Sequence, residues 1–202
     1  DGDRAKVLKF FEENVYGVRP DLSGFKPVQK VVRTEEAPEF KAVRKTVELN
    51  VMTPVGERTF RTYAYFPKKE GKAPVFVYLS FGDPWKFDAS TYHGNLCWDV
   101  KDVLARGYAT ASFCYTDVLP DKSDVFAGIT RGESDWGAIS CWALAASRVA
   151  DWLETDYRLS SGSVMMPDDG CSLSGKDLPH LRLRQARQHR PTRTPTAARR
   201  RR

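Results

Sequence analysis

Residues 134–156, SDWGAISCWALAASRVADWLETD, decide the fold of this chain. Ser134 is a suitable helix cap because its hydroxyl can accept hydrogen bonds from free backbone amides, and Asp135 suits the positive end of a helix dipole. The apolar residues that follow recur at intervals of three and four, the spacing of one buried helix face: Ile139, Trp142, Ala143, Ala146, Val149, Ala150 and Leu153. Polar residues fill the opposite side: Ser140, Ser147, Arg148, Asp151, Glu154 and Thr155. This pattern predicts one long helix packed closely against a sheet.

Two nearly unbroken apolar runs precede this helix. They are Pro74–Phe81 (PVFVYLSF) and Tyr108–Tyr115 (YATASFCY), and each is typical of a strand buried on both faces. Between them, Trp98–Arg106 (WDVKDVLAR) predicts a short amphipathic helix, with Gly107 in the position of its C-terminal cap. The alternation of strand and helix favours an α/β fold with a parallel sheet and helices on both faces. A sheet that ended at Tyr108–Tyr115 would have an unpaired edge there, which predicts marginal stability.

The segments nearer the amino terminus add an antiparallel part. Val7–Val15 (VLKFFEENV) predicts a short amphipathic helix, and Asp21–Pro38 predicts a connector that wraps the surface. Val43–Thr53 (VRKTVELNVMT) and Thr59–Phe66 (TFRTYAYF) alternate apolar and polar residues, which predicts an antiparallel hairpin. We therefore expect a mostly parallel sheet preceded by an amino-terminal hairpin.

Charge divides the chain into two unlike parts. Residues 157–202 contain ten Arg, one Lys and three Asp, a net charge of +8, whereas residues 1–156 carry 21 basic and 23 acidic side chains, a net charge of −2. We expect an amino-terminal helix and connector over 1–40, a partial α/β domain over 41–177 and a disordered basic tail over 178–202. The tail fits either an out-of-frame terminus or an arm that binds nucleic acid. The body has no interleaved aromatics or basic face, so nucleic acid is not an expected partner.

The composition also argues against several kinds of site. No run of about eighteen apolar residues is present, so we expect no membrane span. Cys97, Cys114, Cys141 and Cys171 lie far apart without Cys-x-x-Cys spacing, which disfavours zinc and favours buried free thiols over disulfides. His93 lies in the loop after the first apolar run, where α/β sheets bind ligands, but a lone loop histidine is more often a surface contact. We expect neither a metal nor a cofactor.

A serine motif follows the predicted long helix. Residues 170–176 read GCSLSGK, and they come after Val164–Met166, the apolar part of a short predicted strand. A serine flanked by small residues after a strand is typical of a nucleophile elbow, because the turn there is sharp and strained. Ser172 occupies the serine position of the Gly-x-Ser-x-Gly pattern, but Ser174 stands where the second glycine belongs. The motif alone does not separate an elbow from an ordinary loop.

Four stretches between about Phe10 and Asp156 resemble the glucuronoyl esterases of carbohydrate esterase family 15. They are FFEENVYGVRP, APVFVYLSFG, RGYATASFCYTDVLPD and DWGAISCWALAASRVADWLETD. These proteins are α/β-hydrolases that cleave esters of glucuronic acid linking xylan to lignin. In the family a short strand leads to Gly-[Cys/His]-Ser-Arg-x-Gly-Lys, and here GCSLSGK begins fourteen residues after Asp156. The resemblance implies that Ser172 is the nucleophile and that Lys176 contacts sugar hydroxyls of the glucuronate.

The resemblance also implies a secreted or periplasmic serine esterase of lignocellulose degradation that acts on glucuronoxylan or lignin–carbohydrate esters, although this sequence opens without a visible signal peptide. The family's arginine after the serine, which helps to stabilise the oxyanion, is Leu173 here. Pro179 and arginines replace the expected Ala-rich helix, and only His180 and His189 follow the serine. The triad acid and histidine normally lie downstream of the serine, so we expect this chain to be truncated or inactive.

Two alternatives stay open. A non-catalytic hydrolase-fold remnant or carbohydrate-binding protein would use Trp85, Tyr92 and Trp98 only to stack on sugar. A short-acyl esterase of the acetyl-xylan type would share the fold and lack the preference for an acidic sugar. A methyl ester of a uronic acid distinguishes these functions. A glucuronoyl esterase should hydrolyse it, and a non-catalytic protein should bind it without turnover. A short-acyl esterase should show no preference for the acidic sugar.

Overall fold

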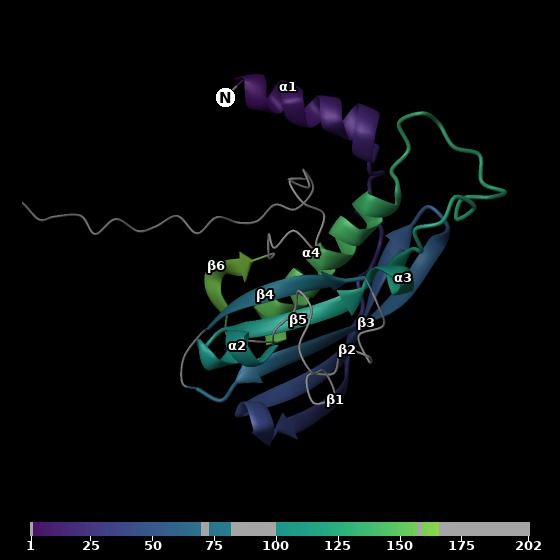
Figure 1. Ribbon diagram of the computed structural model, residues 1–202. Helices are drawn as coiled ribbons and strands as arrows, with labels where there is room; N and C mark the ends of the chain where they lie inside the picture. Colours follow the sequence, from purple (N-terminus) through teal and green to yellow (C-terminus); the bar gives the residue numbers. More distant parts are fainter. Residues whose placement is uncertain (1, 70–72, 82–99, 157–158, 166–202) are drawn as a thin grey trace, which may run out of the picture.

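The computed structural model describes residues 2–69, 73–81, 100–156 and 159–165. Six strands in this part of the chain form one sheet in the order β1-β2-β3-β5-β4-β6 (Figure 1). The strands are β1 (Gln29–Ala37), β2 (Ala42–Thr53), β3 (Gly56–Pro67), β4 (Ala73–Ser80), β5 (Ala109–Cys114) and β6 (Leu159–Met165). The helices are α1 (Gly2–Phe11), continued by a π-helical turn (Glu12–Tyr16), a 3-10 turn (Pro38–Phe40), α2 (Val100–Ala105), α3 (Tyr115–Val118) and α4 (Ala138–Asp156).

The sheet is mixed rather than mostly parallel. β2 pairs antiparallel with both β1 and β3, and β3 also pairs antiparallel with β5. β4 lies parallel between β5 and β6. The expectation of a mostly parallel sheet was wrong because the antiparallel part contains three strands instead of a two-stranded hairpin. The parallel strands β4 and β5 confirm the predicted alternation of strand and helix.

β5 does not lie at an edge, which corrects the expectation of an unpaired edge after Tyr108–Tyr115. It is bonded to β3 on one side and to β4 on the other, and all of its residues are buried. The crossover from β4 through α2 returns the chain between β3 and β4 instead of adding a strand outside them. Within the described sheet, the edges are β1 and β6.

α4 begins four residues later than predicted, and its cap is not Ser134. The first helical hydrogen bond runs from the amide of Cys141 to the carbonyl of Gly137 (3.2 Å). Ser134 lies in a turn before the helix, and its carbonyl accepts a hydrogen bond from the amide of Val18 (2.6 Å). The segment 134–137 is therefore used for pairing with the amino-terminal part of the chain.

The apolar face of α4 is confirmed. The residues of this face that are buried are Trp142, Ala143, Ala146, Val149 and Leu153. Ser140 is also buried, although it was assigned to the polar side. Its hydroxyl donates a hydrogen bond to the carbonyl of Tyr16 (2.8 Å), which allows a polar side chain to be buried in the helix interface.

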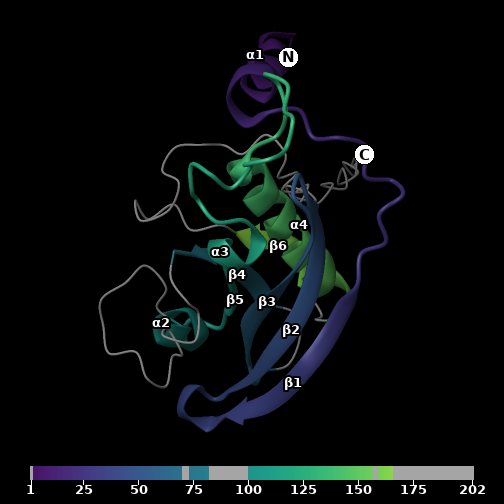
Figure 2. The same ribbon diagram turned by 90° about the vertical axis from the view of Figure 1, so that its right-hand side faces the viewer.

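Helices cover both faces of the sheet, as predicted (Figure 2). On one face α4 and the strands form the main core, where the rings of Phe60 and Phe113 lie 5.4 Å apart. On the other face, Val100 and Leu104 of α2 join a smaller cluster with Tyr65 of β3. Gly107 follows α2 with a φ of +80°, in agreement with its predicted role as a cap.

The predicted hairpin is confirmed as β2 and β3, but Asp21–Pro38 is more than a connector. It contains β1, which pairs with β2 along its whole length. The side chain of Asn50 in β2 accepts a hydrogen bond from the amide of Val28 (2.6 Å) and so guides the chain into β1. The strand was missed because its first six residues are exposed and show no apolar alternation.

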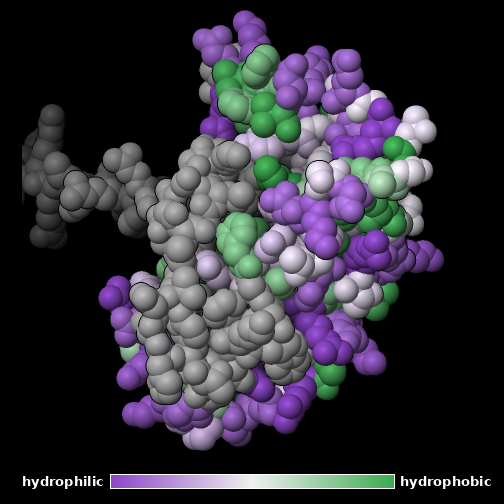
Figure 3. All heavy atoms as spheres, turned by 45° about the vertical axis from the view of Figure 1, so that its right-hand side comes forward, coloured by the Kyte–Doolittle hydropathy of each residue, from purple (hydrophilic) through white to green (hydrophobic). Residues whose placement is uncertain are grey.

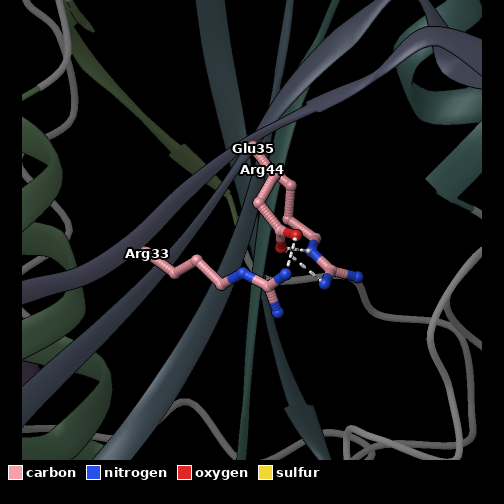
Figure 4. A network of polar contacts seen from close by, with 3 residues as sticks. All are labelled: Arg33, Glu35 and Arg44. Atoms are coloured by element: carbon pink, nitrogen blue, oxygen red, sulfur yellow. Dashed lines mark hydrogen bonds and ion pairs between the residues drawn. The ribbon is translucent and has the colours of Figure 1, made fainter.

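An ion network joins β1 to β2 (Figure 4). Arg44 donates to one carboxylate oxygen of Glu35 from Nε (3.1 Å) and from Nη2 (2.7 Å). Nη2 of Arg33 lies 2.6 Å from the other carboxylate oxygen. The side chain of Arg44 is only 16% exposed, so water screens this contact less than a surface ion pair. The network stabilises the pairing of a strand that buries little apolar area.

α1 starts earlier than the predicted helix over Val7–Val15, and its apolar face is exposed. Val7, Phe10, Phe11 and Val15 are 40–59% exposed. α1 stands away from the sheet in Figure 2, and Figure 3 shows hydrophobic side chains at the top of the molecule, where α1 lies. The pattern predicted a helix correctly, but no described element covers that face. None of the helices in the described ranges has the length and apolar content that a membrane-spanning helix requires.

Candidate active site

The parallel strands β4, β5 and β6 have their carboxyl ends along one border of the sheet. This border is the candidate active site, and below it is called the strand edge, as distinct from the edge strands β1 and β6. Ser80 of β4 is level with Cys114 of β5, and Met165 of β6 is level with Phe76 of β4. In open α/β sheets, ligands bind outside the carboxyl ends of the parallel strands. The chain leaves β6 toward the serine motif at this same end of the strands.

A row of aromatic rings runs through the described part of this edge. The ring of Tyr115 lies 5.4 Å from that of Phe81 and 5.1 Å from that of Trp142. Trp142 is buried and donates its indole N–H to the carbonyl of Leu119 (2.8 Å). Phe81, at the exit of β4, is 47% exposed. The row therefore connects the core to a solvent-facing ring at the end of the strands.

Arg131 holds the segment between β5 and α4. Its guanidinium lies 3.8 Å from the centre of the Phe126 ring, and its Nη2 donates to the carbonyls of Asp135 and Trp136 (2.9 Å each). The carboxylate of Asp135 accepts a hydrogen bond from the amide of Gly132 (2.8 Å). These contacts fix the path of the chain from the exit of β5 to the start of α4.

The amino-terminal residues 16–18 attach to the same place. The carbonyl of Tyr16 accepts hydrogen bonds from the amide of Gly137 (3.0 Å) and from the hydroxyl of Ser140 (2.8 Å). Val18 forms a parallel bridge with Asp135. We call residues 16–18 the amino-terminal clip. It supports the start of α4, and therefore one side of the candidate active site, from a distant part of the sequence.

Both described cysteines are free and buried, as predicted. Sγ of Cys114 lies 3.0 Å from the hydroxyl oxygen of Thr116 at the exit of β5. Burial raises the pKa of Cys141 to about 12, against a smaller opposing effect of the Arg131 charge. Cys141 is therefore a thiol at neutral pH and a poor nucleophile. Within the described ranges, no three His, Cys, Asp or Glu side chains gather as a metal site.

The site residues predicted from the sequence lie outside the described residues, and their roles stay predictions. They are the nucleophile Ser172 and the sugar-binding Lys176, together with Leu173, His93, His180, His189, Trp85, Tyr92 and Trp98. Cys97 and Cys171 also lie outside that part of the chain. What the structure adds is the place of the strand that precedes the serine motif in the sequence, because β6 pairs parallel with β4.

Sequence reasoning missed the residues that support this edge. Arg131 lies in a polar loop without periodicity, so nothing distinguished it from a solvated charge. Ser140 carried a signal that could have been used, because it is flanked by Ile139 and Cys141 in a stretch of small and apolar residues. Gly17 was predicted from the sequence only to end the amino-terminal helix, and the structure gives it a φ of +81° beside the segment before α4.

Solved esterase structures are similar to this fold. The glucuronoyl esterase from Solibacter usitatus matches with a TM-score of 0.65 and 27% identity, over 81% of this chain and 50% of that chain. A glucuronoyl esterase of carbohydrate esterase family 15 from Teredinibacter turnerae matches with a TM-score of 0.64 and 23% identity, over 82% and 44%. A promiscuous esterase of the same family from a marine bacterial metagenome matches with 0.63 and 20%, over 82% and 51%. No protein-family model and no curated protein matches the chain.

These similarities confirm the resemblance seen in the sequence. The chain spans about half the length of the esterases that it matches. The chain therefore has an incomplete α/β-hydrolase fold, similar to that of the glucuronoyl esterases of carbohydrate esterase family 15.

Proposed function

We propose that this chain carries the nucleophile of a carbohydrate esterase that hydrolyses glucuronate esters in glucuronoxylan or lignin–carbohydrate material. One observation carries the proposal: β6 pairs parallel with β4, and the chain continues from β6 into the serine motif. Met165 is level with Phe76, four residues before β4 ends at Ser80. Six residues separate Met165 from Ser172, which is enough chain to reach the same edge.

In the proposed reaction, Oγ of Ser172 attacks the carbonyl carbon of the ester and gives up its proton to a base. The tetrahedral intermediate collapses, the C–O bond to the alcohol breaks, and the alcohol leaves with a proton. Water then hydrolyses the acyl-enzyme to the free uronic acid and restores the serine hydroxyl. Lys176 would bind the sugar hydroxyls of the glucuronate. No step requires a metal or cofactor.

Two features predict that this polypeptide turns over slowly or not at all. Leu173 replaces an arginine, and removing one oxyanion donor typically costs about 10²–10³ in kcat. His180 and His189 are the only histidines after the serine, in a segment rich in arginine. If a residual rate is measurable, Leu173→Arg should raise it, because a guanidinium can stabilise the negative charge of the intermediate.

Hydrolysis of the methyl ester of glucuronic acid tests the proposal. We expect at most slow turnover, which Ser172→Ala abolishes and Ser174→Ala leaves in place. Faster hydrolysis of acetylated xylan than of the uronate ester would instead favour a short-acyl esterase. Turnover that survives Ser172→Ala would rule out the assigned nucleophile. We also propose a secreted or periplasmic location, because a polymeric cell-wall ester is met outside the cytoplasm.

A non-catalytic carbohydrate-binding protein is the second candidate. The exposed ring of Phe81, backed by Tyr115, favours it, because aromatic faces at a strand edge can pack against sugar rings. This candidate predicts binding of glucuronoxylan oligosaccharides without turnover. Sequencing the coding DNA beyond the codon of Asp156 in all three frames separates the two. A frame with arginine after the serine and a later histidine motif would favour the esterase.

A further inference from the structure

A groove lies on the α4 face of the sheet, and none of the residues that line it belongs to β4, β5 or β6. Its volume is about 560 Å³, within the range of pockets that bind small ligands. Its walls come from the π-helical turn, the connector over 19–25, β2 and α4. Val51 and Leu144 form an apolar base, and Phe25 contributes an aromatic ring. Four separate segments of the chain therefore build this hollow.

Arg19 is a cation without a partner in this groove. Within the described part of the chain, its side chain forms no ion pair and no hydrogen bond. The other arginine that lines the groove, Arg148, lies 3.2 Å from the carboxylate of Asp151 and is 25% exposed. A guanidinium that no protein carboxylate neutralises can bind a carboxylate of a ligand through two parallel N–H···O bonds.

Two carboxylates and a hydroxyl group also line this groove. The carboxylate of Asp21 accepts hydrogen bonds from the amide and the hydroxyl of Ser23 (2.9 Å each). These bonds lower the pKa of Asp21, with the backbone bond as the larger cause, so the group stays ionised at neutral pH. Glu12 is the second acidic group of the lining. Carboxylate oxygens accept from sugar hydroxyls, while the Phe25 ring offers a face for the C–H side of a sugar.

We propose that this groove binds a uronic-acid-bearing oligosaccharide, with the uronate carboxylate on Arg19 and the sugar hydroxyls on Asp21 and Ser23. The choice of a sugar ligand rests on the proposed carbohydrate esterase function. The groove shares no lining residue with the strands whose ends would hold the ester, so it would retain an acidic chain on the same protein without taking part in the reaction.

Calorimetric titration of the full chain with a glucuronoxylo-oligosaccharide bearing a free carboxylate tests this site. That ligand has no ester, so the result does not depend on Ser172. We expect it to bind about tenfold more tightly than a neutral xylo-oligosaccharide of equal length, the worth of one charge-assisted contact. Arg19→Ala should reduce the affinity for the acidic oligosaccharide to that for the neutral one. Ser23→Ala should lower the affinity for both oligosaccharides.

Arg106→Ala is the matched control, because Arg106 is an exposed arginine next to α2 on the opposite face of the sheet. It should leave both affinities unchanged. Equal binding of the acidic and neutral sugars, no binding of either, or an equal loss in Arg19→Ala and Arg106→Ala would each overturn the proposal. If the esterase assay fails but binding still depends on Arg19, the proposed reaction is contradicted and the proposed binding site in the groove is retained.

Discussion

The parallel part of the sheet and its antiparallel edge are stabilised in different ways. β5 buries all six of its residues, and α4 contributes a continuous apolar face to the main core. β1 exposes its first six residues and is held by backbone pairing, by Asn50 and by the network of Arg33, Glu35 and Arg44. The first region depends on apolar burial, which leaves a periodic signal in the sequence. The second depends on polar contacts between strands, which leave none.

Replacing apolar side chains with alanine should give the largest difference in free energy of unfolding between the two regions. Phe113 is fully buried in β5, so Phe113→Ala should lower the free energy of unfolding by about 3–5 kcal/mol. Val31 in β1 is 44% exposed, so Val31→Ala should change it by less than about 0.5 kcal/mol. Urea denaturation followed by tryptophan fluorescence measures both. Equal losses would show that the edge contributes to the core as much as β5 does.

The amino-terminal clip links the exposed end of the molecule to α4, and Gly17 is its tightest point. Gly17 has a φ of +81°, and a Cβ there would lie 2.2 Å from the carbonyl oxygen of Asp135 and 2.3 Å from the Cα of Trp136. Gly17→Ala should cost about 3 kcal/mol, because backbone strain and a clash with backbone atoms add together.

Gly128→Ala is the control for the Gly17 prediction. Gly128 has a φ of +80°, but a Cβ would meet nothing within 4 Å. Its cost should be about 1 kcal/mol, from the left-handed conformation alone. If the two variants lose the same stability, the close approach of the clip to the segment before α4 is not maintained in solution.

The same contrast explains which parts of the fold could be predicted. β4, β5 and the buried face of α4 follow from runs and periods of apolar residues, and their predictions are confirmed. β1 and the true start of α4 could not be predicted, because they depend on partners far along the chain, such as Tyr16 for Ser140. The positions where β4 and β5 end at the candidate site were predictable, because the apolar runs that mark these strands also mark their ends. The loop residues that hold the chain beside the site, such as Arg131, were not predictable, because a loop arginine has no periodic pattern around it.

The buried thiol of Cys141 should make stability fall at alkaline pH. Burial raises the pKa of Cys141 from 9.0 to about 12, so the folded chain keeps the thiol proton that the unfolded chain loses. This contribution to stability is complete below pH 9 and is lost as pH rises toward 12. The free energy of unfolding should fall by up to about 1.4 kcal/mol per pH unit in that window. Cys141→Ala should lack this component in urea denaturation at pH 8–10.5, and equal slopes for the two proteins would contradict it.

The smallest effect concerns the hydrogen bond from Ser140 to the clip. Ser140→Ala removes the bond between its hydroxyl and the carbonyl of Tyr16, which keeps its second bond from the amide of Gly137. The carbonyl is therefore not left unpaired, and the loss should be about 1 kcal/mol. Ser147→Ala is the matched control, because the Ser147 hydroxyl bonds only within α4, to the carbonyl of Ala143 (3.1 Å). Its replacement should be neutral or slightly stabilising, since alanine favours the helix.

Hydrogen exchange makes this last comparison specific to the clip. The amide of Val18 donates to the carbonyl of Ser134, so its protection reports whether the clip is closed. Ser140→Ala should speed exchange at Val18 more than at the amides of β5, whereas Ser147→Ala should change neither. An equal change at Val18 and in β5 would mean that the clip and the core open together. The amino-terminal segment would then be part of the same cooperative unit as the parallel strands.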